Sequence, residues 1–362
     1  NPVVCHRLSS DHRLIIIQMK LASKSHIIKE VEVLHRLVKV MGNMGVCHST
    51  LIRIASSFII IILLSPVSNA EVRDYSKGWD GDIIVEGGRT IIVEELSTTW
   101  CVSCAEIDPY LQQVADAHGS RITIVTYHPT DGDDAFQPEA AKERIDRMRL
   151  INPQIGQTPT FVVESGLLRV GPDSWPDVQK DILKEETNRQ ETSQLSFSVS
   201  KFGDNYTAKI ENLSLISADY ETQLTFMMMA HDLPVPEGYI NPGEATRDRV
   251  VTATASCKLA NNTINNTGFT QASGTLCSSD FSVTFSPEGK FSIVLIHEAT
   301  ESSLKENSDT AKTLGLVEFA FRDIQIQSQV NILPVVFFSV GLIGIIWVAY
   351  DKFNAVKNRK AS

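Results

Sequence analysis

The sequence predicts an α/β domain, then an all-β sandwich, then one C-terminal transmembrane helix. Three observations lead to this fold class. Between residues 82 and 190, apolar β-branched runs alternate with stretches of helical spacing, which is typical of an α/β domain. From residue 195 to residue 326, short strands with alternating polar and apolar residues favour a sandwich. An uncharged apolar run long enough to span a bilayer then covers residues 332–350.

The N-terminal 70 residues read as export sequence. An apolar core at residues 57–64 follows Arg53 and precedes the small residues of Ser68-Asn69-Ala70, which predicts a signal peptide at 41–70 that is cleaved after Ala70. The apolar core is too short to span a bilayer, which argues against a transmembrane helix here. The alternative to a signal peptide is a buried helix. We interpret residues 1–40, which precede Met41, as upstream or leader sequence.

The C-terminal apolar run predicts a single-pass membrane protein. Trp347 and Tyr350 stand at one end of the run, where aromatic rings favour the membrane interface. The tail at 351–362 is basic, so it is expected in the cytoplasm, with the preceding domains extracellular or periplasmic. The formal net charge of -10 and the lack of a basic stripe argue against a nucleic-acid partner.

Four of the six cysteines follow the predicted cleavage site. They are Cys101, Cys104, Cys257 and Cys277. An exported protein meets an oxidising environment in which disulfide bonds persist.

The first pair, Cys101 and Cys104, stands where a strand is followed by a helix. Residues 90–96 are a β-branched run, and helical spacing begins at Cys104. Cys101 would then lie at the helix N-terminus, where unpaired N–H groups and the helix dipole stabilise a thiolate, which is the nucleophile in disulfide exchange. Further strands at 121–127 and from 160, an insertion at 128–157 and a helix at 173–188 complete the predicted domain at 71–190.

Five features of this region resemble the thioredoxin superfamily, over about residues 82–190. In chain order they are the strand 90–96, the acid Glu95, the motif Trp100-Cys101-Val102-Ser103-Cys104, Pro109 in the helix, and Thr158-Pro159 before a strand. The resemblance implies a thioredoxin-like fold, a cis peptide bond before Pro159 and a redox-active disulfide. It also implies roles for individual residues, namely Cys101 as nucleophile, Cys104 as resolving thiol, Glu95 as proton carrier, and Trp100, Thr158 and Pro159 as substrate-binding residues.

Other interpretations of this region stay open. The disulfide could be structural, or the two cysteines could join His128 in a metal site, although no fourth ligand is evident and we expect no metal. Glu94 could be the buried acid in place of Glu95, because a shift of one residue exchanges the faces of a strand. The dipeptide between the cysteines leaves the direction of electron flow open.

The region at 192–328 is expected to be an immunoglobulin-like sandwich. Residues 281–285 and 291–295 alternate on either side of Pro287-Glu288-Gly289 and predict a hairpin. Cys257 and Cys277 flank a polar loop that a structural disulfide would close. Four Asn-x-Ser/Thr motifs are possible glycosylation sites, at Asn205, Asn212, Asn261 and Asn265.

These observations predict a membrane-anchored, outward-facing thiol–disulfide oxidoreductase. Its partners would be thiols or disulfides of exported proteins and a separate redox partner, and it would need no cofactor. The alternative is a surface binding protein whose thioredoxin-like domain is a scaffold with a static disulfide. The sequence shows no phosphate-binding loop, no Ser-His-Asp arrangement and no haem-attachment motif.

Overall fold

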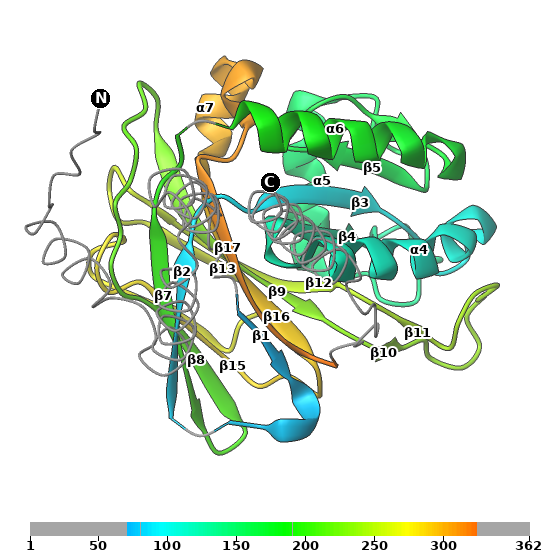
Figure 1. Ribbon diagram of the computed structural model, residues 1–362, viewed down its shortest axis with the longest axis horizontal. Helices are drawn as coiled ribbons and strands as arrows, with labels where there is room; N and C mark the ends of the chain where they lie inside the picture. The colour runs from blue at the N-terminus through cyan, green and yellow to red at the C-terminus, as the bar shows by residue number, and fades with distance from the viewer. Residues whose placement is uncertain (1–70, 80, 190, 324–362) are drawn as a thin grey trace, which may run out of the picture. The chain divides into compact units, whose positions relative to one another are not determined.

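The computed structural model describes residues 71–79, 81–189 and 191–323, in which β-structure dominates. Seventeen strands and four α-helices occur in these residues (Figure 1). The elements up to residue 190 are β1 (Glu71–Asp74), β2 (Asp82–Gly87), β3 (Ile91–Leu96), α4 (Val102–His118), β4 (Ile122–Tyr127), α5 (Glu139–Ile151), β5 (Thr160–Val163), β6 (Arg169–Val170) and α6 (Trp175–Asn188). Those that follow are β7 (Leu195–Phe202), β8 (Asn205–Ile210), β9 (Thr222–Ala230), β10 (Leu233–Pro234), β11 (Thr246–Arg247), β12 (Val250–Lys258), β13 (Ile264–Thr267), β14 (Gln271–Ser273), β15 (Ser282–Phe285), β16 (Phe291–Ala299), α7 (Glu301–Glu306) and β17 (Gly315–Arg322).

One ten-stranded sheet runs through both halves of the described chain. Its order is β1-β17-β16-β9-β12-β4-β3-β5-β6, with β13 paired to β12. The two halves meet where β12 runs parallel to β4, with Val250 opposite Thr126. The backbone N–H of Thr126 donates to the carbonyl oxygen of Arg249 at 3.0 Å. Strands far apart in the sequence are therefore neighbours in one sheet.

Helices cover both faces of the sheet around β3. Because side chains alternate along a strand, Ile91 and Val93 pack against α4 and α6, and Ile92 and Leu96 pack on the face that α5 covers. The core beside α5 also includes Met227 of β9. Thus α5 packs across the junction between the two halves and buries apolar side chains from both.

The five-stranded sheet packs against the part of the ten-stranded sheet that contains β9, β16 and β17, on the face opposite the core beside α5. Its order is β14-β15-β8-β7-β2, and β2 joins it by pairing with β7. Phe197 of β7 meets Phe226 of β9 edge to face, with ring centroids 5.6 Å apart. Val85 of β2 is fully buried in the same core. A sandwich does form, but it includes strands from the N-terminal end of the described chain.

The predicted fold class is therefore wrong. The described chain is not a self-contained α/β thioredoxin-like domain followed by a separate immunoglobulin-like sandwich, because one continuous sheet joins the two predicted regions and β1 and β2 pair with strands of the second. The predicted C-terminal transmembrane helix at 332–350 lies outside the described residues, as do the signal peptide and the basic tail. Within the described ranges, no helix is long and apolar enough to cross a membrane.

Two local predictions in the second region are also wrong. The strands at 281–285 and 291–295 do not form a hairpin, since β15 pairs with β8 and β14 whereas β16 pairs with β9 and β17. Alternation identifies a strand and its buried face, but not the strand beside it. The polar residues at 299–309 suggest a loop or flexible segment from the sequence, but this stretch contains α7, whose N-cap Thr300 accepts a hydrogen bond from the N–H of Ser303.

A buried ion network fastens α5 to both halves of the sheet. The guanidinium of Arg144 donates to both carboxylate oxygens of Glu298 in β16, at 2.9 and 3.0 Å, and to Glu94 of β3 at 3.3 Å. Burial raises the pKa of Glu94, and this effect outweighs the attraction of Arg144. Burial also opposes ionisation of Glu298, but Arg144 and Arg147 hold its pKa at about 2. This network explains why Glu94 is buried as well as Glu95.

Candidate functional site

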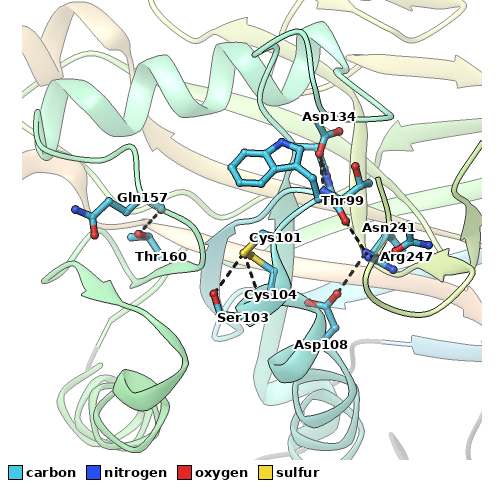
Figure 2. The surroundings of a disulfide bond; sticks show 12 residues. Thr99, Cys101, Ser103, Cys104, Asp108, Asp134, Gln157, Thr160, Asn241 and Arg247 are labelled. Carbon is cyan, nitrogen blue, oxygen red and sulfur yellow. Dashed lines mark hydrogen bonds and ion pairs between the residues drawn. A yellow bond between two sulfur atoms is a disulfide. The ribbon is translucent and has the colours of Figure 1, made fainter. Parts of the chain in front are cut away.

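A disulfide bond between Cys101 and Cys104 lies at the N-terminus of α4 (Figure 2). Cys101 is the N-cap residue, and its sulfur accepts a hydrogen bond from the N–H of Cys104 at 3.1 Å. Cys101 keeps 5% of its surface exposed, whereas Cys104 is fully buried. An incoming thiolate would therefore reach the sulfur of Cys101 first, and the helix N-terminus would stabilise a thiolate there.

The loop after β4 supports the segment in front of Cys101. Asp134 accepts a hydrogen bond from the N–H of Thr99 at 2.8 Å, and the hydroxyl of Thr99 accepts one from the N–H of Ala135 at 3.1 Å. The same carboxylate of Asp134 lies 2.8 Å from Nδ1 of His128. Trp100 is exposed, and its indole N–H donates to Asp131 at 3.3 Å. The predicted insertion thus holds the Cys-x-x-Cys motif in place.

A second support comes from the loop between β10 and β11. The buried side chain of Arg247 donates to the carbonyl oxygen of Thr99 at 3.3 Å and to Asn241 at 2.6 Å (Figure 2). Its Nε lies 3.5 Å from a carboxylate oxygen of Asp108 in α4. A Cβ atom added to Gly243 would lie 2.8 Å from the Cβ of Ala105, so this loop packs directly on the first turns of α4.

Sequence reasoning missed this loop and its arginine. Arg247 and Thr99 are 148 residues apart in the chain, and no motif around Arg247 marks it as part of a redox site. The β10–β11 loop was expected to belong to a different domain.

Two acids share a cavity of about 30 Å³ beside α4. Its lining includes Glu95, Asp108 and Arg247. The hydroxyl of Thr126 donates to Glu95 at 3.0 Å. Burial, together with the nearby charge of Asp108, raises the pKa of Glu95 well above its usual value. Burial also raises the pKa of Asp108 to about 6, and the charge of Arg247 limits that rise. Both carboxyl groups are therefore poised to hold a proton that an exposed carboxyl group would lose.

The bond between Thr158 and Pro159 is cis, as the resemblance implies. Pro159 is buried and Thr158 is partly exposed. The residues on either side of this pair, Gln157 and Thr160, are linked by a 2.6 Å hydrogen bond from the hydroxyl of Thr160 to the carbonyl oxygen of Gln157. In Figure 2 these two residues lie on the side of the disulfide opposite Arg247.

The other predicted site residues lie away from this disulfide. Cys257 and Cys277 form a buried disulfide with a Cα–Cα distance of 5.6 Å. The four glycosylation motifs have exposed asparagines, which are Asn205, Asn212, Asn261 and Asn265. Within residues 71–323 as described, no cluster of His, Cys, Asp and Glu has the arrangement of a metal site.

A Ser-His-Asp chain that the sequence does not show occurs elsewhere in the fold. Nε2 of His231 lies 2.8 Å from the hydroxyl of Ser292, and Nδ1 lies 2.6 Å from Asp248. Ser292 is fully buried within β16, so its hydroxyl is out of reach of a substrate. We interpret this chain as a structural hydrogen-bond network and not as a hydrolytic site, although its three residue types match a serine triad.

No protein-family model and no curated protein matches this chain. Two solved structures are similar to about two thirds of it. HBP35 of Porphyromonas gingivalis is 12% identical, with a TM-score of 0.46, and the match covers 67% of this chain and 79% of that chain. The protein AGR_C_4864 from Agrobacterium tumefaciens is 12% identical, with a TM-score of 0.41, and the match covers 66% and 96%. Similarity at this level names no family and supports no activity.

Proposed function

We propose that this chain is a thiol–disulfide oxidoreductase that acts on exported proteins through Cys101 and Cys104. The observation that carries the proposal is the disulfide at the N-terminus of α4, in which Cys101 keeps 5% of its surface exposed, with a buried acid of raised pKa beside a cavity at the same helix. The sequence features that resemble the thioredoxin superfamily support the same activity. A structural disulfide needs neither the helix N-terminus nor a buried acid.

The proposed exchange conserves electrons and protons. A substrate thiolate attacks Sγ of Cys101, the bond between Cys101 and Cys104 breaks, and Cys104 leaves as a thiolate that takes the proton of Glu95. A second substrate thiolate then attacks the substrate sulfur of the mixed disulfide and releases Cys101 as a thiolate. The substrate loses two electrons and the protein gains them. The reverse sequence reduces a substrate disulfide.

The surface around the disulfide suits a polypeptide substrate. Trp100 and Val102 are exposed on either side of Cys101, and we assign substrate docking to Trp100, Thr158 and Pro159. The β10–β11 loop adds Tyr239 and Ile240, both exposed, beyond its contact with α4. Exposed aromatic and apolar side chains of this kind mark interaction surfaces.

The proposed location and partner rest on the sequence alone. We propose an outward-facing protein that is anchored by residues 332–350, with the basic tail in the cytoplasm. One anchor helix carries no groups that transfer electrons across a bilayer, so a separate redox partner would regenerate the disulfide or the dithiol. The competing proposal is a surface binding protein with a static disulfide.

The reduction potential of the Cys101–Cys104 couple tests this proposal. The full chain would be equilibrated in glutathione buffers and its free thiols counted after alkylation. A potential of about -120 to -200 mV would indicate an oxidant or isomerase, and about -270 mV a reductant. A potential below about -300 mV with slow exchange would indicate a structural disulfide and favour the binding protein.

Replacing Glu95 by glutamine should slow exchange at Cys104 and stabilise the fold at high pH. Loss of the proton carrier is expected to cost roughly 10²- to 10⁴-fold in the exchange rate. Because the pKa of Glu95 is raised in the folded protein, the wild type loses stability as the pH rises from its unfolded-state pKa toward its folded-state pKa. E95Q lacks this loss, so its advantage in free energy of unfolding should grow as the pH rises above the unfolded-state pKa of Glu95.

Stopped-flow reduction by dithiothreitol and urea unfolding at several pH values would measure the two effects of E95Q. Glu86→Gln is the control, since Glu86 is an exposed acid of β2 in the other sheet. It should change neither quantity. Equal stability curves for E95Q and the wild type would contradict the assignment of a buried, proton-bearing Glu95.

A further inference from the structure

Three buried polar atoms beside the redox helix belong to residues that line one cavity, and they have no hydrogen-bond partner among the described residues. They are Oε1 of Glu95, Oγ of Ser97 and Nε2 of His128. Their residues are 0% or 1% exposed. A fourth lining residue, Arg247, pairs its Nε with Asp108 at 3.5 Å. Leaving one buried polar atom without a partner costs about 1–3 kcal/mol, so three such atoms around one space indicate a polar ligand there.

The size of the cavity identifies that ligand as water. The volume of about 30 Å³ exceeds the roughly 10–15 Å³ that one water molecule requires. A buried water also needs about two to four polar partners, which this lining offers.

We propose that water in this cavity joins Glu95 to His128, so that His128 exchanges protons with Glu95 whenever the Cys101–Cys104 disulfide opens or closes. The inference rests on the proposed function, because it assigns a positioning residue to that same reaction. His128 touches neither sulfur, and it acts through the water and Glu95.

The fixed orientation of His128 directs its second nitrogen to the cavity. Nδ1 lies 2.8 Å from Asp134, so this nitrogen is the one that carries a proton toward the carboxylate. Burial opposes ionisation of Asp134, but hydrogen bonds from His128 and from the backbone N–H of Phe136 and Thr99 hold its pKa below the usual value. The contact with Asp134 fixes the ring of His128, and its other nitrogen, Nε2, has no partner among the described residues.

Charged groups of both signs face His128 across the cavity. Asp134 approaches from its own loop, Glu95 from β3 and Asp108 from α4. The segment from the β10–β11 loop to the start of β12 contributes the remaining charged side chains of the lining, which are Glu244, Arg247, Asp248 and Arg249. The pH dependence of the exchange rate therefore reflects all of these charged residues. Substitution of His128 is needed to identify its own contribution.

The proton balance follows from the exchange step. When Cys104 leaves as a thiolate, Glu95 gives it a proton and becomes a carboxylate. The imidazolium of His128 then passes a proton through the water to Glu95. Neutral His128 later regains a proton from solvent. In the reverse direction Glu95 takes the proton of the Cys104 thiol and passes it to His128.

The test compares substitutions that break the relay at different points. His128→Asn keeps an amide N–H near Asp134 but removes the nitrogen that faces the cavity. Ser97→Val leaves His128 intact and fills the cavity with methyl groups. Phe136→Leu is the matched control, because the Phe136 ring packs edge-on against His128 at 4.9 Å without facing the relay atoms. The rate of disulfide opening by dithiothreitol in the full chain would be measured from pH 5.5 to pH 8.5.

We expect H128N and S97V each to be about tenfold slower than the wild type near neutral pH. This effect is smaller than the 10²- to 10⁴-fold effect of a direct acid or base, because Glu95 remains. Both variants should lose an inflection in the pH–rate profile that the wild type and F136L share. A purely structural role for His128 would lower the melting temperature and leave that inflection in place.

Each other outcome decides against part of the proposal. Wild-type rates and profiles in both variants would overturn the relay. A slow H128N with a wild-type S97V would overturn the role of water. The proposed function is tested separately, by Cys101→Ser in the same assay. An active C101S would overturn the proposed function itself. An inactive C101S together with a wild-type H128N would overturn only the relay.

Discussion

Replacing Cys101 by serine should abolish disulfide exchange, whereas replacing Cys104 by serine should trap a mixed disulfide with the substrate. Cys101 is the N-cap residue of α4 and keeps 5% of its surface exposed, whereas Cys104 is fully buried, so without Cys101 no accessible thiolate can form at the N-terminus of α4. In C104S, Cys101 still reacts, but no second thiol resolves the product. Activity should fall at least about 10³-fold in both variants, because covalent catalysis needs both steps.

The measurement is exchange with glutathione disulfide, followed by mass spectrometry without reductant. C104S should gain the mass of one glutathione at Cys101, and C101S should gain none there. The control is the double substitution of Cys257 and Cys277 by alanine, which removes a buried disulfide of 20-residue separation. It should lower stability by about 3 kcal/mol and leave exchange intact. Full activity in C101S would overturn the proposed function.

Replacing Arg144 by methionine should destabilise the protein by about 3–5 kcal/mol at pH 7. Removing one partner of a buried ion network leaves the others buried without compensation. Arg144 donates to both oxygens of Glu298 and to Glu94, and lies 3.3 Å from the hydroxyl of Tyr127. Its loss would leave two buried carboxyl groups with Arg147 as the remaining cation in contact with Glu298.

The pH dependence gives this prediction its sign. The pKa of Glu298 is held at about 2 in the folded protein, so its ion pairs contribute stability above the unfolded-state value of about 4.5. That contribution is lost as the pH falls through the folded-state pKa. The deficit of R144M should therefore be largest near neutral pH and shrink in acid.

Urea unfolding at pH 7 and pH 4 would test R144M against a matched control on the same helix. Arg149→Met removes an exposed arginine that pairs with Asp146 at 2.8 Å. Exposed pairs contribute about 0–1 kcal/mol, so R149M should lie close to the wild type. Similar unfolding curves for R144M and R149M would show that the network is not important for stability.

Local sequence patterns predicted much of the secondary structure but not its assembly. The helix that begins behind Cys101 and the strand that carries Glu95 occur where the spacing of apolar residues placed them. Local patterns do not identify the strand that pairs with a given strand. That choice depends on which sheet faces and edges are complementary in the folded chain. The pairing of Val250 with Thr126 therefore left no local signal, and the two expected domains proved to share a sheet.

The two glutamates of β3 illustrate the same limit. Period-two alternation placed Glu94 and Glu95 on opposite faces and suggested that one of them would face solvent. Both are buried, because helices cover both faces of the sheet at β3. Arg144 compensates Glu94, and the cavity beside α4 accommodates Glu95. Burial on the second face depended on α5, which the insertion supplies.

By itself the sequence determined the chemistry of the candidate site, which is a Cys-x-x-Cys pair at a helix N-terminus with an acid on the preceding strand. These features are local, and helix geometry and residue type are enough to specify them. Only the tertiary structure decided what surrounds the pair. It brought His128, Asp108 and Arg247 to one polar cavity, because the β12–β4 junction places the β10–β11 loop against α4. Contacts between residues so distant in the chain depend on how whole faces pack, and no local periodicity encodes them.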